Sequence, residues 1–179
     1  MVVCVRRVRV ETPVDRLDLR AGDIVYLDNI VFTARDRTLR MILEQGAPLE
    51  LRGLAMYHCG PLIVSVGGGW RVLSAGPTTS ARFARETVEV ACRYGVKLVI
   101  GKGGLAGWGD KLAECGAAYL VFPGGAGSLA AEKIAGVVEV FWLDELGPTE
   151  ALWVFRVRGF GPLIVVVGTD GSCLRRNLC

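Results

Sequence analysis

The spacing of apolar residues changes along the chain, from short alternating runs to a regular succession of strands and helices. Alternating apolar and polar positions favour half-buried strands, whereas apolar positions three or four residues apart favour helices. In the first half these patterns predict strands over residues 3–10, 24–27, 30–32 and 54–58, a helix over residues 35–45 and a hairpin over residues 62–73. Gly46 is typical of the residue that ends such a helix.

The second half has the pattern of an α/β unit. It predicts strands over residues 96–100, 117–122, 137–141, 151–157 and 163–167, and helices over residues 78–95, 105–115 and 128–135. Thr78 or Thr79 can cap the first of these helices, and Gly95 can end it. Because neither a repeat nor a linker interrupts the pattern, we expect one α/β domain over residues 1–179.

Composition narrows the classes of protein that the chain can be. Of its 179 residues 51% are hydrophobic and 22% charged, which excludes a disordered chain, and 21 basic against 18 acidic residues leave a charge of only +3. No stretch approaches the ~18 apolar residues of a membrane-spanning helix, and the arginine-rich start lacks the hydrophobic segment of a secretion signal. We therefore expect a cytoplasmic chain with neither a membrane nor a nucleic acid as its partner.

The cysteines indicate no metal centre in this chain. They are Cys4, Cys59, Cys92, Cys115, Cys173 and Cys179, and no two of them form a CxxC pair. Binding of a metal ion or iron–sulfur cluster by this chain alone is therefore not expected. We expect small buried thiols, and disulfides are the alternative.

One glycine-rich turn raises the possibility of a nucleotide site. Residues 101–106 (GKGGLA) fit the GxGxxG/A pattern between a predicted strand and a predicted helix. However, the next predicted strand ends in Val121-Phe122-Pro123 without the acidic residue that holds the ribose. Gly103 also stands where a P-loop needs Ser or Thr to hold magnesium. Nucleotide binding is thus only a minor alternative.

Three cations lie at three predicted strand-to-helix starts: Arg35, Arg82 and Lys102. Such positions can meet at one edge of an α/β sheet, where ligands bind. An arginine at a helix start opposes the helix dipole, so Arg35 indicates an external anion or a carboxylate partner. Thr78 lies four residues before Arg82, which can place its hydroxyl over the same helix end. The set suits a dicarboxylate, because arginine forks onto a carboxylate while lysine acts as a point charge.

Several longer motifs then give the chain a family resemblance. They are TARD at residues 33–36, YHCGP at 57–61, AGPTTS at 75–80, IGKG at 100–103, PGGAG at 123–127 and DELGPTEALW at 144–153. In this order, across nearly the whole chain, they resemble the β subunit or C-terminal domain of class I fumarases and of the related L-tartrate dehydratases.

The resemblance implies a fold, an activity and a partner. The implied fold is a swivelling β/β/α three-layer domain with a mixed sheet. The implied activity is a hydro-lyase that reversibly hydrates fumarate to (S)-malate, with L-tartrate or another hydroxy-diacid as the alternative substrate. It further implies a [4Fe-4S] cluster on a partner α subunit, in a hetero-oligomer. A catalytically idle metabolite-binding or scaffold domain is the alternative function.

The resemblance also assigns roles to the residues singled out above. It implies that Thr78 is a catalytic threonine, that Arg82 and Lys102 are catalytic and bind substrate, and that Arg35 binds substrate. Such cations would stabilise the negative charge that builds beside a carboxylate when a proton is removed. Leu39 departs from the family pattern, because relatives usually have a histidine there. That departure makes fumarate less certain as the substrate.

Overall fold

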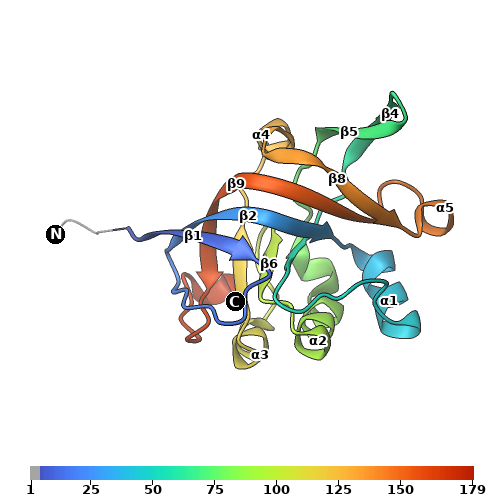
Figure 1. Cartoon of the computed structure of the whole chain (residues 1–179). Helices are drawn as coiled ribbons and strands as arrows, with labels where there is room; N and C mark the ends of the chain where they lie inside the picture. Colours follow the sequence, from blue (N-terminus) through green and yellow to red (C-terminus); the bar gives the residue numbers. More distant parts are fainter. Residues whose placement is uncertain (1–4) are drawn as a thin grey trace.

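The computed structural model describes residues 5–179, which form a mixed α/β fold (Figure 1). In chain order its elements are β1 (Arg7–Thr12), β2 (Ile24–Thr33), α1 (Asp36–Gln45), β3 (Ala55–Tyr57), β4 (Leu62–Val66), β5 (Gly69–Ser74), η1 (Ser80–Phe83), α2 (Ala84–Tyr94), β6 (Leu98–Gly101), α3 (Gly109–Glu114), β7 (Ala118–Val121), α4 (Gly127–Glu132), β8 (Ile134–Phe141), α5 (Leu143–Leu146), β9 (Leu152–Val167) and η2 (Arg176–Leu178). The strand predicted over residues 3–10 lies partly outside the described residues.

The large sheet is mixed, as expected, but it also closes on itself. Strands β1, β2, β3, β6 and β7 pair in parallel, and β9 runs antiparallel to β7, β2 and β8. Because β9 pairs with both β7 and β2, these two strands and β3 and β6 between them form a barrel-like ring with β9. In Figure 1 β9 runs beside β2 along its length. We expected a sheet in a layered domain, and its closure into a ring was not predicted.

Two strands are longer than the sequence pattern predicts. Residues 24–27 and 30–32 form one strand, because Asn29 takes a positive φ of 80° and the register with β9 shifts there without breaking. Residues 151–157 and 163–167 also belong to one strand, β9, which passes through Gly159 at a φ of 57°. Bulges of this kind bend a strand while keeping it in the sheet.

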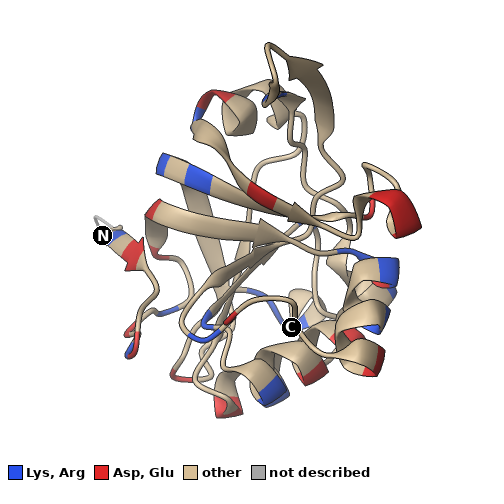
Figure 2. Ribbon diagram, turned by 45° about the vertical axis from the view of Figure 1, so that its right-hand side comes forward, with Lys and Arg blue, Asp and Glu red and all other residues tan. Residues whose placement is uncertain are grey.

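Two apolar clusters hold the fold together. One fills the space enclosed by the ring and includes the fully buried Leu27, Trp153 and Phe155. The other lies between the sheet and helices α1, α2 and α3, which cover one side of it in Figure 1. Each fully buried large apolar side chain contributes roughly 1.5–3 kcal/mol. Figure 2 shows basic and acidic residues interspersed along these helices, in line with the low net charge.

The predicted hairpin is confirmed as β4 and β5, which project from the end of the molecule away from α2 and α3 (Figure 1). Trp70 on β5 packs edge to face against Trp153, with ring centroids 5.3 Å apart. Its indole therefore has a packing role, although 42% of its surface stays exposed.

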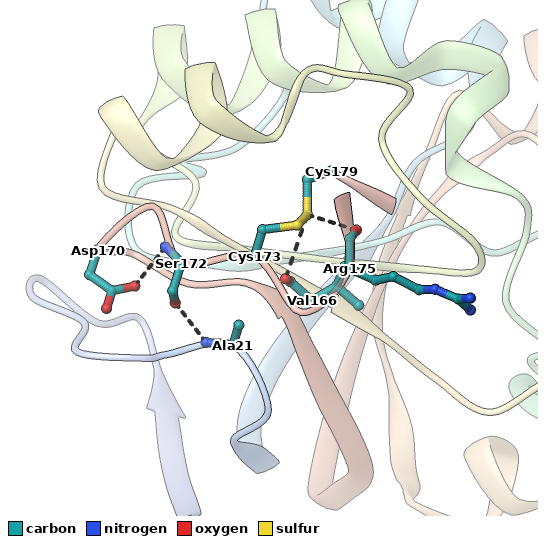
Figure 3. The surroundings of a disulfide bond; sticks show 7 residues. All are labelled: Ala21, Val166, Asp170, Ser172, Cys173, Arg175 and Cys179. Atoms are coloured by element: carbon teal, nitrogen blue, oxygen red, sulfur yellow. Dashed lines mark hydrogen bonds between the residues drawn. A yellow bond between two sulfur atoms is a disulfide. The ribbon is translucent and has the colours of Figure 1, made fainter. Parts of the chain in front are cut away.

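The expectation of free buried thiols is wrong for four cysteines. Cys92 in α2 is bonded to Cys115 after α3, and Cys173 to Cys179 (Figure 3). Their Cα atoms lie 5.2 and 6.3 Å apart, which is within disulfide range. The folded chain brings these pairs together at separations that carry no CxxC signal. Only Cys59 is a free buried thiol among the described residues, and Cys4 lies outside them.

No helix in the described part of the chain is long and apolar enough to cross a membrane.

Candidate functional site

The site lies at the edge of the sheet where the parallel strands end. Strands β2, β3, β6 and β7 run in the same direction, so the segments after Thr33, Tyr57, Gly101 and Val121 emerge together. In open and in barrel-forming α/β sheets, ligands bind at the edge where the parallel strands end. Backbone hydrogen bonds join neighbouring segments, as from the Ala34 N–H to the carbonyl of Tyr57 and from the His58 N–H to that of Ile100.

Thr78 and Lys102 are direct backbone neighbours. The Thr78 N–H donates to the carbonyl of His58 at 2.6 Å, and the Lys102 N–H donates to the carbonyl of Thr78 at 3.1 Å. The Ser80 N–H then donates to the carbonyl of Lys102 at 3.1 Å. Thr78 is half-buried and Lys102 is exposed. Their main chains are thus fixed while the ammonium group faces solvent.

Lys102 lines a cleft of about 320 Å³. The other lining residues are Ser74, Gly76, Pro77, Gly124, Gly125, Gly127 and Ser128. The glycine-rich loop of residues 123–127 packs tightly against residues 74–76. The Ala75 N–H donates to the carbonyl of Gly127 at 3.0 Å, and a Cβ atom on Gly127 would lie 2.5 Å from the Ser74 hydroxyl. The size of this cleft suits a small ligand, and Lys102 is the cation on its wall.

Arg82 lies beside this arrangement on η1 and is exposed. The predicted threonine cap is wrong, because Thr79 precedes a 3₁₀ turn and makes no capping hydrogen bond. The backbone of residues 78–80 is instead occupied by its bonds to His58 and Lys102, so α2 begins only at Ala84. Within residues 5–179 the Arg82 guanidinium forms no ion pair, which leaves it available to an anion.

Arg35 has a carboxylate partner within the chain. Its Nε atom lies 3.1 Å from Oε1 of Glu150, at an angle that gives an ion pair without a hydrogen bond. The Arg37 N–H donates to the other oxygen of Glu150 at 3.1 Å. Burial raises the pKa of Glu150, and the positive charge of Arg35 opposes that rise. One of the two readings of Arg35, a carboxylate partner, is therefore confirmed.

Gly60 makes room for the Arg35 guanidinium. A Cβ atom at Gly60 would lie 2.5 Å from Nη1 of Arg35 and 2.9 Å from the carbonyl of Thr149. Glycine in the YHCGP motif therefore lets the main chain pass directly against the arginine. The neighbouring Cys59 forms an isolated antiparallel β-bridge with Pro77. This bridge connects the Arg35 side of the edge to the segment that carries Thr78.

The structure does not place all of the predicted residues around one cleft. Arg35 and Arg82 do not line the cleft that Lys102 lines. The expectation of three cations at three helix starts is also wrong for Lys102, because α3 begins only at Gly109. The amides of the intervening loop are used elsewhere: Leu105 donates to the carbonyl of Leu178, and Gly107 and Gly109 donate to that of Cys179.

Sequence reasoning missed two residues at this edge, Glu150 and His58. His58 is fully buried and lies 2.8 Å from the Ser80 hydroxyl and 3.1 Å from that of Thr87. Burial lowers its pKa to about 3. The available signal was that His58 is the one histidine of the chain and directly follows a predicted strand. Leu39, where relatives usually have a histidine, is fully buried in the cluster under the helices.

The donor groups of the described residues do not fit a metal cluster. Among residues 5–179 no three His, Cys, Asp or Glu side chains lie close enough together to hold a metal ion. Burial raises the pKa of the free Cys59 thiol, which disfavours the thiolate that binds metals.

Comparison with known proteins gives a consistent family match. Residues 4–177 match the model of the fumarase C-terminus family. The L(+)-tartrate dehydratase subunit beta of Escherichia coli K12 is 42% identical over 170 residues, covering 89% of this chain and 81% of the relative. A putative L(+)-tartrate dehydratase subunit beta of Methanocaldococcus jannaschii is 38% identical, covering 91% and 87%. A putative fumarate hydratase class I of Geobacillus stearothermophilus is 36% identical, covering 90% of this chain and 31% of the relative.

Proposed function

Because this chain belongs to the fumarase C-terminus family, we propose that it is the β subunit of a two-subunit hydro-lyase that acts on a four-carbon diacid. The observation that carries this proposal is the pairing of Thr78 with Lys102 beside a small cleft, at the sheet edge that also presents Arg82. In this proposal the domain swivels over a larger α subunit in the cytoplasm, and the substrate is enclosed between the two.

The cations have a direct chemical role in such a reaction. Removal of a proton beside a carboxylate builds negative charge on that carboxylate. Lys102 and Arg82, both exposed and at the same edge, would bind and stabilise the charged group. Arg35 is a binding residue whose charge is partly offset by Glu150, so we assign it to orienting the substrate.

Thr78 is assigned the proton transfer that the family resemblance implies. Thr78 is half-buried, and within residues 5–179 its hydroxyl has no side-chain hydrogen-bond partner, which leaves it available to a ligand. A free hydroxyl is a poor base and needs activation. His58 is not the activating group, since both of its ring nitrogens are already engaged by Ser80 and Thr87. We assign the activation to the neighbouring cations or to a group of the partner subunit.

The [4Fe-4S] cluster is assigned to the partner subunit in this proposal. The donor groups of residues 5–179 do not fit such a cluster. No step of the chemistry assigned to Thr78, Arg82, Lys102 and Arg35 passes through the cluster. What this chain supplies is anion binding, orientation of the diacid and one proton-transfer group.

Two substrate pairs are candidates. The sequence motifs led us to fumarate and malate first. L(+)-tartrate is supported by the two relatives that match over most of both chains, which bear the name tartrate dehydratase. Tartrate differs from malate by one hydroxyl group, and specificity of that kind depends on polar groups that pair with it.

The test is reconstitution of the enzyme. The chain is co-expressed anaerobically with its cognate iron–sulfur subunit, and fumarate, malate and L(+)-tartrate are assayed with each subunit alone and with both. We expect turnover only with both subunits, and the active diacid decides between the two substrate pairs. If the cluster-loaded pair is inactive with every diacid, the enzymatic function is wrong and a metabolite-binding or scaffold role takes its place.

A further inference from the structure

A continuous chain of buried side-chain hydrogen bonds lies directly beneath the site. The Tyr119 hydroxyl is 2.9 Å from the Ser80 hydroxyl, which is 2.8 Å from Nδ1 of His58. Nε2 of His58 is 3.1 Å from the Thr87 hydroxyl, which is 2.9 Å from the carbonyl of Phe83. The four side chains that form this series of hydrogen bonds are completely buried. The function proposed above uses none of them.

The series of hydrogen bonds ends on both sides at a backbone carbonyl, and each carbonyl belongs to one of the two candidate site segments. At one end Thr87 can donate to Phe83, the residue after Arg82. At the other end Tyr119 can donate to Gly103, the residue after Lys102, at 3.2 Å. The hydrogen bonds therefore connect the turn that carries Arg82 (residues 80–83) with the loop that carries Lys102 (residues 102–103) through the interior of the protein.

Each hydroxyl has one proton, so the hydrogen bonds can run in only two complete orders. In the first, Tyr119 donates to Ser80, Ser80 donates to Nδ1 of His58, and the Nε2–H group of His58 donates to Thr87, which donates to Phe83. In the second, every donor is reversed and Tyr119 donates to Gly103. Both orders satisfy every group with a neutral ring. The first has the shorter terminal bond, 2.9 against 3.2 Å, so we expect the Nε2–H tautomer.

The surroundings of the ring keep it neutral and fixed. The Phe83 ring packs edge to face against the His58 ring, with centroids 4.8 Å apart. Both hydrogen-bonding partners of the His58 ring are uncharged hydroxyls. A Cβ atom at Gly101 would overlap the Ser80 hydroxyl and lie 3.1 Å from Nδ1 of His58. The glycine before Lys102 thus leaves the space in which Ser80 reaches the ring. Buried polar networks that are fully satisfied in this way rigidify their surroundings.

We propose that Tyr119, Ser80, His58 and Thr87 form a positioning network that holds the Arg82 turn and the Lys102 loop in a fixed relation to each other. That this network aligns two substrate-binding cations rests on the proposed function. The network itself is given by the hydrogen-bond distances. The four residues are positioning residues, since none of them reaches the cleft.

The structural content is tested by NMR on the full chain labelled with ¹⁵N. Because His58 is the one histidine, long-range ¹H–¹⁵N correlations report its tautomer without ambiguity. We expect the neutral Nε2–H form in the unaltered chain. Thr87→Val removes the acceptor at Nε2 and should convert His58 to the Nδ1–H form. Tyr119→Phe should shift the amide signals of Lys102 and Gly103. An unchanged tautomer in Thr87→Val, or unchanged amides in Tyr119→Phe, overturns the network.

The consequence is tested in the reconstituted two-subunit enzyme. Tyr119→Phe should lower kcat/KM for the active diacid at least tenfold. Tyr94→Phe is the matched control, because it removes one hydroxyl that donates to Ile42 at 3.2 Å, away from this edge, and should leave kcat/KM unchanged. Equal kcat/KM in the two variants overturns the positioning role. If the unaltered pair turns over no diacid, the proposed function fails, and the NMR experiment still decides on the network.

Discussion

The Ser80 hydroxyl occupies the place where a Cβ atom on Gly101 would lie. Gly101→Ala should therefore destabilise the chain by about 1–3 kcal/mol, the usual cost of overpacking a well-filled interior. For a chain of this size that corresponds to a lowering of Tm by roughly 2–4 °C per kcal/mol, which differential scanning calorimetry can measure. Gly136→Ala is the control, since a Cβ atom there meets no neighbour within 4 Å. Equal Tm values for the two variants would contradict the tight packing at Gly101.

Removal of either exposed cation should disable the enzyme without unfolding it. Arg82→Ala and Lys102→Ala should each lower kcat/KM of the reconstituted pair by at least ~10², about 2.7 kcal/mol of transition-state stabilisation. Both side chains are exposed, so Tm should change little. Arg85→Ala, an exposed arginine one turn further along, should retain full activity. Near-native kcat/KM for Arg82→Ala or Lys102→Ala would refute the site assignment.

The pH dependence of stability should carry the signature of His58. Its pKa is lowered by burial to about 3, against 6.5 for an exposed histidine. Between these values the unfolded chain binds a proton that the folded chain excludes, so stability is lost as pH falls below 6.5. The unfolding equilibrium constant should rise by up to about tenfold per pH unit, as measured by urea denaturation between pH 6.5 and 5.

The matched variant for this pH experiment is His58→Gln, which should be less stable at pH 7 but should lose the slope between pH 6.5 and 5. The carboxyl groups of Asp23 and Asp28 have pKa values lowered by Arg6 and Arg9, so their contribution to stability is lost only at lower pH. Glu150, whose pKa burial raises, acts in the opposite direction in this interval, so a loss of stability on lowering the pH from 6.5 to 5 is assigned to the histidine. A slope that persists in His58→Gln would assign it to other groups.

The two disulfides should have different effects when removed. By chain entropy alone, the Cys92–Cys115 bond, with a sequence separation of 23, contributes about 3 kcal/mol, and the Cys173–Cys179 bond, with a separation of 6, about 2 kcal/mol. Cys92→Ser with Cys115→Ser should therefore lower the free energy of unfolding more, as measured by urea denaturation.

Removal of the Cys173–Cys179 bond should also have a local effect. The carbonyls of Leu178 and Cys179 accept hydrogen bonds from the amides of the loop after Lys102, and the disulfide holds this segment in place (Figure 3). In Cys173→Ser with Cys179→Ser, amide hydrogen exchange at Leu105, Gly107 and Gly109 should accelerate. It should stay slow in the other double variant. Equal protection of these amides in both would contradict a role of residues 173–179 in holding the loop.

Elements whose signals are local were predictable from the sequence. The helix over residues 35–45 matches α1 within one residue, because its apolar period and Gly46 both lie within the helix or directly after it. The split of β9 into two strands was wrong for the opposite reason. Gly159 has the local signature of a turn, but pairing with β2 and β8 keeps the chain in the sheet. Tertiary pairing overrode local propensity there.

The candidate site was predictable to the extent that strand order determines it. The rule that parallel strands end at one edge places Arg35 and Lys102 there, after β2 and β6. Thr78 follows the separate β4–β5 hairpin and reaches this edge through its backbone hydrogen bonds to His58 and Lys102. The partner of Arg35 lies 115 residues away, and that of His58 lies 22 residues away on a separate turn. No short motif encodes contacts of this kind, because they depend on how segments distant in the sequence pack together.

Ring closure also sets the order in which the chain can fold during synthesis. Strand β9 pairs with β2, which precedes it by more than 100 residues, and with β7 and β8. Until β9 has left the ribosome, β2 and β7 lack their shared partner. Contacts of such long range slow folding, because the intervening chain must first be ordered. The apolar interior of the ring therefore stays open to chaperones, and to aggregation, until β9 has been made.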